Sequence, residues 1–335
     1  MKQSNLFCII LLLIFVVLAG CTSTEETNVV NSDVNAVSVK EEGSREIKIV
    51  TSKDKNTYSI LGEILAKQII NTNVDNVTTS LLSSERAIAS LYEVVDGHAD
   101  FAIVETDIAY YATHATDLFE GNVPITGFHG VASIYPEVLL IIASQESEIQ
   151  TVEELAGKKV AVGQRGSTTE AKADQILKLH GVSFEEMNTK SMDIGEAIEN
   201  IKDGTIDAAF ITTTMEYEEI DLLNEKENEI SFISMSVDKT ADIEGEFPYF
   251  ISLTIPKDVF DTPAEVTTVA NQVMLIVNSS VDDDIVYEVT KAIMENEEKI
   301  SNQLQLDKNI ELDKVIDPIP IDVHPGAERF YNEKQ

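Results

Sequence analysis

The chain has 335 residues, of which 59 are Asp or Glu and 24 are Lys or Arg, so its formal net charge is −35 at pH 7. Such an acidic chain lacks the basic surface with which proteins neutralise phosphates, and this excludes nucleic acid as a partner. An acid-rich, lysine-poor surface is also typical of salty surroundings, where short screening lengths weaken the repulsion between carboxylates.

The first 20 residues predict the compartment in which the protein works. Lys2 precedes an unbroken apolar run over residues 7–18, which is shorter than the roughly 20 apolar residues of a spanning helix and is typical of a signal-peptide core. The run leads into Ala19-Gly20-Cys21, which resembles the lipobox of bacterial-type lipoproteins. We therefore expect residues 1–20 to be a lipoprotein signal peptide and Cys21 to carry lipid. The alternative is an ordinary secretory signal.

Residues 21–45 are polar and lack aromatic side chains, which predicts a disordered tether. The roughly 290 residues that follow lie near the upper limit for a single core, so we expect two lobes. Removal of the signal peptide leaves Cys21 as the remaining cysteine, and the five histidines show no metal-binding spacing. We therefore expect no disulfide, no metal and no cofactor.

Short apolar runs alternate with helical periodicity over this body, a pattern typical of βαβ units and parallel sheets. The expected elements, in chain order, are a strand at 47–50, helices at 58–70 and 84–95, a strand at 101–104, a helix at 152–156, a strand at 159–162, helices at 167–180 and 194–202, and a strand at 208–211. The three aspartates at 282–284 are expected to stabilise the start of a helix that ends near Ile300, rather than to bind a cation.

One segment of the chain is echoed by another. Residues 96–104 (DGHADFAIV) align without a gap with residues 203–211 (DGTIDAAFI). Each copy predicts a helix end, a glycine in the left-handed region that stops the helix, an aspartate and a buried strand. The echo predicts two lobes of similar construction, although helix–glycine–strand joints are common enough to produce such a match by chance.

Several stretches, taken together and in order, carry a family resemblance. They are residues 96–104 (DGHADFAIV) with 107–110 (DIAY), 132–137 (ASIYPE), 155–163 (LAGKKVAVG) with 166–170 (GSTTE), 203–204 (DG) with 207–210 (DAAF), 286–292 (VYEVTKA) and 324–331 (HPGAERFY). In these stretches, which span nearly the whole body, the chain resembles the TAXI group of receptors that serve TRAP transporters. The glycine-rich segments usual in that family are replaced here by TSKDKNTY at 51–58 and LLSSE at 81–85.

The resemblance implies a fold class and an arrangement of domains. The fold is expected to be α/β, a type II periplasmic-binding-protein fold in which two α/β lobes are joined by two hinge crossings. We place the first lobe at residues 46–133 plus 250–335 and the second at 134–249. The crossings are expected at 134–137 and 247–251, where proline and aromatic residues precede an apolar strand.

Ligands of open α/β sheets gather at the carboxyl ends of strands and at helix N-termini. The candidate ligand-binding residues at such positions are Ser52, Thr57, Tyr58, Ser83, Ser84, Arg86, Glu105, Thr106, Asp107, Arg165, Gly166, Ser167, Thr168, Thr169, Thr212 and Thr213. The helix start at 163–170 (GQRGSTTE) would suit a carboxylate, whereas a capping box of Ser167 and Glu170 is the plain structural alternative. Arg86 and Arg165 are expected as counter-ions, with surface salt bridges as the alternative.

The predicted function is that of an extracytoplasmic solute-binding receptor. It would be lipid-anchored to the outer face of the cytoplasmic membrane and would deliver a small anionic organic solute, dicarboxylate or glutamate-like, to a TRAP-type transporter. The alternatives are the binding lipoprotein of an ABC transporter for another organic anion and a surface sensor without transport. No nucleophile–base pair or metal cluster supports an enzyme on this fold.

Overall fold

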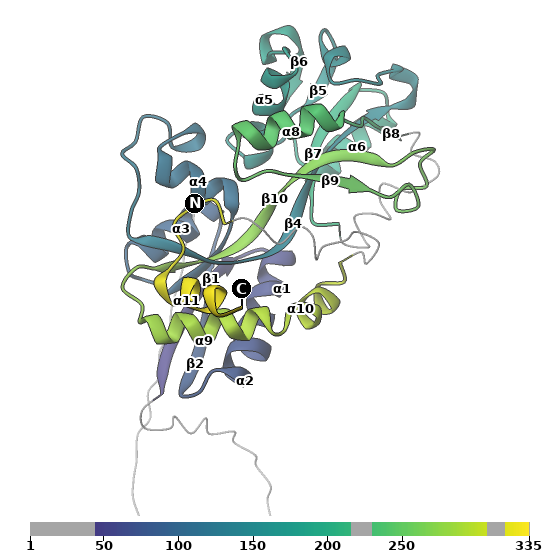
Figure 1. The fold of residues 1–335 in the computed structure, drawn as a ribbon. Helices are drawn as coiled ribbons and strands as arrows, with labels where there is room; N and C mark the ends of the chain where they lie inside the picture. The colour runs from purple at the N-terminus through teal and green to yellow at the C-terminus, as the bar shows by residue number, and fades with distance from the viewer. Residues whose placement is uncertain (1–43, 216–229, 307–318, 335) are drawn as a thin grey trace, which may run out of the picture. The chain divides into compact units, whose positions relative to one another are not determined.

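The strands of this chain form one ten-stranded mixed sheet (Figure 1). The computed structural model describes residues 44–215, 230–306 and 319–334, so the predicted signal peptide, Cys21 and nearly all of the tether lie outside the described residues. The strands are β1 (Arg45–Ser52), β2 (Val77–Ser84), β3 (Phe101–Glu105), β4 (Phe128–Ser144), β5 (Lys159–Ala161), β6 (Asn188–Lys190), β7 (Ala208–Thr213), β8 (Ile230–Phe232), β9 (Ile251–Ile255) and β10 (Val266–Asn278). Their order is β2-β1-β3-β10-β4-β7-β5-β6, with β8 beside β4 and β9 beside β10.

Helices follow most of the strands. The α-helices are α1 (Thr57–Glu63), α2 (Asn71–Asn73), α3 (Ala87–Val95), α4 (Thr106–His114), α5 (Thr168–Leu179), α6 (Ile194–Lys202), α8 (Val237–Glu246), α9 (Asp283–Met294), α10 (Glu297–Leu304) and α11 (Pro325–Lys334). The π-helix η1 (Ile64–Ile70) continues α1, and the 3₁₀ turns are η2 (Asp117–Phe119), η3 (Gln145–Ser147), η4 (Glu153–Leu155) and η5 (Phe184–Glu186). In the part of the chain that the structure describes, no helix combines the length and apolar character of a membrane span.

Two long strands connect the halves of the sheet. β4 has 17 residues and β10 has 13, and they run antiparallel along each other from Leu139↔Val269 to Phe128↔Asn278. One end of the pair meets the parallel strands β1 to β3 through β10, and the other end meets β5 to β7 through β4 (Figure 1). A binding site at the middle of β4 and β10 would therefore touch both halves.

Alternation along each strand divides the core between the faces of the sheet. In β3, Phe101 and Ile103 pack with α1, η1 and α9, whereas Ala102 and Val104 pack with α3 and α4. The helix expected at 58–70 is present, and its predicted apolar face, including Leu61 and Leu65, is fully buried. Its second half is the π-helix η1.

The two echoed segments, residues 96–104 and 203–211, have the same local structure. Gly97 and Gly204 end α3 and α6 with φ of 74° and 67°. After each glycine comes an aspartate that accepts a backbone hydrogen bond: Lys48 donates to Asp100 Oδ2 at 2.8 Å, and Lys159 donates to Asp207 Oδ2 at 2.7 Å. Each aspartate thus ties the start of its strand, β3 or β7, to the neighbouring parallel strand. The predicted similarity of the two halves is confirmed at this joint.

Three element predictions need correction. The helix expected at 84–95 begins at Ala87, because the backbone of Arg86 is extended and Ser84 is the last residue of β2. The helix expected at 152–156 is only the turn η4, ended by Gly157 with φ of 81°. The helix that starts at the three aspartates stops at Met294, and α10 follows it; its start is capped by Asp282, as expected.

The second crossing between the lobes is also corrected. The crossing predicted at 247–251 leads into β9, whose first residue is Ile251 and which pairs with the first part of β10 at 266–270. Leu253 and Phe260 pack in one cluster with Ile198 of α6. β9 and the residues that follow it therefore belong with the second half of the sheet. The return path is β10 itself, whose length and burial carry it past both halves.

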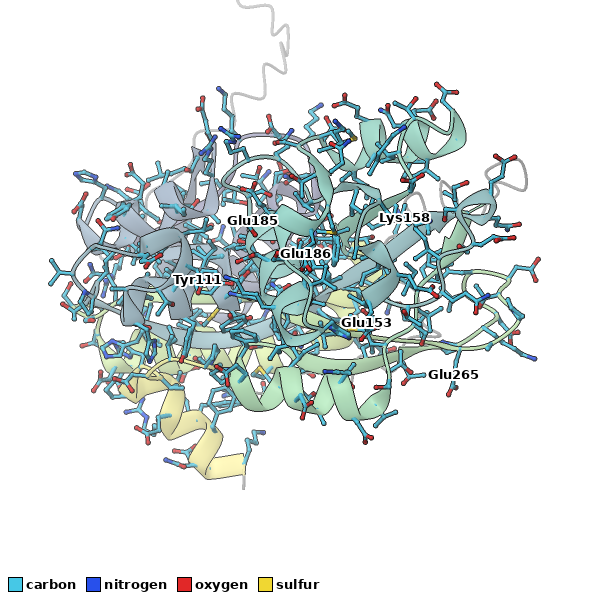
Figure 2. All side chains as sticks on the ribbon, turned by 90° about the horizontal axis from the view of Figure 1, so that it is seen from above. Tyr111, Glu153, Lys158, Glu185, Glu186 and Glu265 are labelled. Carbon is cyan, nitrogen blue, oxygen red and sulfur yellow. The ribbon has the colours of Figure 1, made fainter. Side chains whose placement is uncertain are left out.

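The large negative charge lies mainly at the surface. Glu153, Glu185 and Glu186 are exposed, whereas Tyr111 is fully buried (Figure 2). Buried charged side chains are therefore exceptions in this chain. Burial of an ion costs several kcal/mol unless the ion is paired, so each exception calls for an explanation.

Candidate functional site

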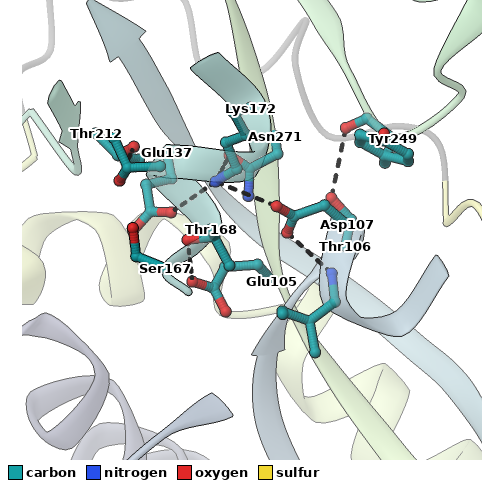
Figure 3. A network of polar contacts seen from close by, with 12 residues as sticks. Glu105, Thr106, Asp107, Glu137, Ser167, Thr168, Lys172, Thr212, Tyr249 and Asn271 are labelled. Carbon is teal, nitrogen blue, oxygen red and sulfur yellow. Dashed lines mark hydrogen bonds and ion pairs between the residues drawn. The ribbon is translucent and has the colours of Figure 1, made fainter. Parts of the chain in front are cut away.

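The buried charged side chains gather where strand ends and helix starts meet the middle of β4 and β10 (Figure 3). β3 ends in Glu105, and α4 begins with Thr106 and Asp107. Glu137 lies in the middle of β4, Asn271 in the middle of β10 and Lys172 on α5. We call Glu105, Asp107, Glu137, Lys172 and Asn271 the central cluster.

Lys172 is the hub of the central cluster. Its side chain is fully buried, and its Nζ donates to Asn271 Oδ1 at 2.8 Å. The same nitrogen lies 3.4 Å from Asp107 Oδ2 and 3.6 Å from Glu137 Oε2 (Figure 3). Burial acts to lower the pKa of Lys172, but the neighbouring carboxylates outweigh it and the pKa is raised. Lys172 therefore remains an ammonium ion and binds α5 to α4, β4 and β10.

Glu105 has different surroundings from the other two carboxyls. It is 9% exposed, and Oε1 accepts a hydrogen bond from Thr168 Oγ1 at 3.5 Å. Oε2 is buried and has no hydrogen-bond partner among the described residues. Burial raises the pKa of Glu105 to about 8, with further contributions from Glu137 and Asp107. Glu105 is therefore mainly protonated at neutral pH.

Tyr58 links α1 to the central cluster. Its hydroxyl donates to Glu137 Oε1 at 3.1 Å. Burial raises the pKa of Tyr58 well above its ordinary value, and the neighbouring Glu105 and Glu137 act in the same direction. The phenol consequently stays protonated and acts as a donor.

A pocket of about 160 Å³ opens beside Glu105. Its lining comes from the ends of β1 and β2 and the starts of α1 and α3, and consists of Ser52, Asp54, Asn56, Tyr58, Ser84, Glu85, Arg86, Ala87, Ser90, Ile103 and Glu105. Arg86 is the residue before α3, and no side chain caps that helix. The pocket therefore combines the Arg86 guanidinium, the Ser52 hydroxyl and an uncapped helix start, which suit an anionic oxygen, with the carboxyls of Asp54, Glu85 and Glu105 in the same lining.

The helix start at residues 163–170, which was predicted to suit a carboxylate, is capped by side chains of the chain itself. Ser167 Oγ accepts from the backbone N–H of Glu170 at 3.2 Å, and Glu170 Oε2 accepts from the N–H of Gly166 at 2.6 Å. The N–H of Arg165 donates to Ser191 Oγ at 2.8 Å. Ser167 is thus the N-cap, and Glu170 binds Gly166 rather than completing a capping box, while Ser167, Thr169 and Thr212 also line a second pocket of about 210 Å³.

The predicted site residues fall into groups. Ser52, Tyr58, Ser84, Arg86 and Glu105 line the pocket beside Glu105, and Asp107 and Thr168 contact the central cluster. Thr57 of α1 lies across the two halves from Thr214, with 3.4 Å between the hydroxyls, whereas Thr169 and Thr212, whose hydroxyls are 2.9 Å apart, both belong to the second half and line a second pocket. The remaining residues have local roles or lie away from the pocket: Ser83, Thr106, Arg165, Gly166, Ser167 and Thr213.

The local roles follow from hydrogen bonds. Thr106 Oγ1 donates to the carbonyl of Tyr249 at 3.4 Å and accepts from the N–H of Gln272 at 3.0 Å. Thr213 Oγ1 accepts from the N–H of Met215 at 3.1 Å. Ser83 and Arg165 are exposed and do not line the pocket.

The sequence interpretation missed the residues that build the central cluster around Glu105 and Asp107. Lys172 stands one helical turn after Thr168, so the two share a face of α5. Asn271 and Gln272 are two amides in the middle of the strand VTTVANQVMLIVN, which is buried along nearly its whole length. Polar residues at such buried positions are a usable signal, because burial of an amide is costly unless it is hydrogen-bonded. Within residues 44–215, 230–306 and 319–334, no group of three or more metal-ligating side chains is placed to hold an ion.

Solved structures with a similar fold include solute-binding proteins. The periplasmic sulfonate-binding protein SsuA from Methylobacillus flagellatus superposes with a TM-score of 0.54 at 12% identity, covering 81% of this chain and 76% of its own. A TctC solute-binding protein from Polaromonas gives 0.53 at 15% identity, covering 78% and 89%. SsuA from Escherichia coli gives 0.50 at 15% identity, covering 86% and 92%.

At these identities the likeness concerns the fold. It confirms the predicted α/β fold of the periplasmic-binding-protein type with two lobes. A family assignment comes from the sequence itself: the sequence profile of the NMT1-like family matches residues 49–334. This chain therefore belongs to the NMT1-like family.

Proposed function

We propose that this chain is the extracytoplasmic solute-binding component of a membrane transporter and that its solute is a small organic anion, a dicarboxylate or a glutamate-like compound. The partner that we propose is a TRAP-type transporter, on the resemblance to the TAXI receptors. The two lobes that close on the solute would be divided across the middle of β4 and β10. Binding without turnover is the proposed activity.

One observation carries this proposal: the pocket beside Glu105 lies at the carboxyl ends of β1, β2 and β3, next to the contact between Glu105 and α5 of the other half. Its walls come from β1, β2, α1, α3 and the end of β3, while Thr168 of α5 contacts Glu105 from the other half. Ligands of open α/β sheets bind at such a meeting of strand ends. The chemistry of the walls then selects the solute.

The pocket favours an anion at Arg86. α3 is nine residues long and has no side-chain cap, so its first N–H groups are available to an oxygen acceptor. Arg86 can bind a carboxylate through two parallel hydrogen bonds, a geometry that lysine does not offer. We place one carboxylate of the solute against Arg86 and the start of α3, with its other end toward the central cluster.

A panel of solutes tests the proposed function. Dicarboxylates, amino acids, sulfonates and polyamines are compared by thermal shift on the chain without residues 1–20, and calorimetry gives the affinity of each positive solute. Dicarboxylates or glutamate-like compounds are expected to raise the melting temperature at millimolar concentration. A protein stabilised only by polyamines or other cations would contradict the anionic site.

Arg86→Ala is expected to weaken the binding of the best anion by about ten- to a hundredfold, because a charge-assisted hydrogen bond to the solute is lost. Arg165→Ala is the matched control, since it removes the same charge from an exposed loop outside the pocket. Calorimetric titration measures both variants. Equal losses in the two variants would show that only the overall charge matters.

Cys21→Ser tests the proposed membrane attachment. Burial of acyl chain contributes about 0.8 kcal/mol per CH₂, so two or three chains hold a protein firmly at a membrane. The variant is expected to leave the membrane fraction for the medium or the soluble fraction, as followed by immunoblotting of fractionated cells. If the Cys21→Ser protein stays with the membrane, the lipid anchor is wrong.

A further inference from the structure

Glu105 differs from the other buried carboxyls because it has no ion-pair partner within 4 Å among the described residues. Asp107 and Glu137 each pair with Lys172. Glu105 makes one long hydrogen bond, from Thr168 Oγ1, and its Oε2 has none. A carboxyl that is nine-tenths buried and lacks both a cation and a full set of donors is poorly stabilised as an anion.

The charged groups around Glu105 come from every element packed on it. Asp107 at the start of α4 and Glu137 on β4 are acidic, and Lys172 on α5 is basic. Tyr58 of α1 contributes a phenol, whose pKa the two glutamates help to raise. Three carboxyls thus face one ammonium group, so the cluster would carry an excess of two negative charges if every acid were ionised. One proton on Glu105 reduces that excess, because the other two acids already share Lys172.

The other residues that line the pocket form the outer surroundings of Glu105. Arg86 lies on its lining together with the acids Asp54 and Glu85, and Lys53 binds Glu85 Oε1 at 3.0 Å on the exposed rim. Arg86 is therefore the cation available to a solute, and the buried Glu105 lines the same pocket. A solute anion held by Arg86 brings negative oxygens toward Glu105.

We propose that Glu105 acts as a neutral carboxylic acid that donates its proton in a hydrogen bond to an oxygen of the bound solute, so that the chain binds the anion together with one proton. The inference rests on the proposed function and adds to it the protonation state that the site requires. An ionised Glu105 would face the solute carboxylate with a like charge, whereas the neutral acid offers a short, strong O–H···O⁻ bond. The elevated pKa of Glu105, about 8, gives the range in which the effect is visible.

The test is a calorimetric titration with succinate, glutarate and 2-oxoglutarate as probes, repeated between about pH 6 and 9.5. Wild-type affinity is expected to be constant below about pH 7 and to fall toward tenfold per pH unit above about pH 8. Glu105→Gln keeps a neutral donor at the same place, so it is expected to bind within about threefold of wild type at about pH 6 and to hold that affinity at high pH. Glu265→Gln makes the same substitution at an exposed position between β9 and β10 (Figure 2) and is expected to follow wild type.

Each other outcome is decisive. A parallel decline with pH in wild type and Glu105→Gln would overturn the inference and leave the proposed function intact. Loss of binding in a folded Glu105→Gln at every pH would also overturn it, since Glu105 would then act as an anion. If no probe binds any variant at any pH, the proposed dicarboxylate function fails together with the inference.

A second measurement covers the case in which Glu105→Gln does not fold. Titration of the wild-type protein at about pH 9 in two buffers of different ionisation enthalpy counts the protons bound with the solute. Uptake of close to one proton supports the inference. Zero uptake at this pH overturns it.

Discussion

Replacement of Lys172 by methionine is expected to lower the free energy of unfolding by about 3–5 kcal/mol, because it leaves buried carboxyls without their cation. Asp107 and Glu137 both lose the ammonium group, and Asn271 loses its donor at 2.8 Å. Urea unfolding followed by circular dichroism at fixed pH measures the change.

Lys178→Met is the matched control, because Lys178 lies on the same helix and pairs with Asp174 at the surface. An exposed pair of this kind contributes about 0–1 kcal/mol. Equal effects of the two substitutions would contradict a buried cluster around Lys172. A loss below about 1 kcal/mol in Lys172→Met would have the same meaning.

Gly326→Ala is expected to lower the free energy of unfolding by about 3 kcal/mol, because a methyl group at this position has no space. A Cβ on Gly326 would overlap the backbone carbonyl of Asp283 and would lie 3.0 Å from the backbone nitrogen of Tyr287. Both neighbours are backbone atoms of α9, so α11 would have to move away from that helix. Urea unfolding again measures the effect.

The control for Gly326 is Gly245→Ala in α8, where a Cβ meets nothing within 4 Å. Alanine in a helix is favoured over glycine by up to about 1 kcal/mol, so this variant is expected to gain stability. A destabilisation of Gly326→Ala no larger than that of a surface substitution would show that α11 does not pack on α9 as described. The glycine of the HPGAER stretch thus has a packing role.

Local patterns in the sequence predicted much of the fold. Leu61 marked the buried face of α1 and Leu65 that of η1, and Gly97 and Gly204 marked the ends of α3 and α6. These signals depend on residues close together in the chain, which is why they could be interpreted without a structure. β10 was not anticipated. Its partner residues in β4 lie more than 100 positions away in the chain, so no local pattern announces the pairing.

The candidate site was predicted only in part, and the reason is again sequence distance. Strand ends pointed to Tyr58, Arg86 and Glu105, which line one pocket. The helix start at Ser167 could not be assigned from the sequence, because capping and ligand binding use the same residues: Ser167 caps the helix and also lines a second pocket. Lys172 was missed because its partners come from α4, β4 and β10.

The central claim is that one organic anion binds between Arg86 and the central cluster. A crystal structure of the chain without residues 1–20, soaked with the best anion of the panel, tests it most directly. The account predicts one solute molecule with a carboxylate on Arg86 and the start of α3, and with an oxygen within hydrogen-bond distance of Glu105. Solute density at another place, with the pocket beside Glu105 occupied by water alone, would contradict it.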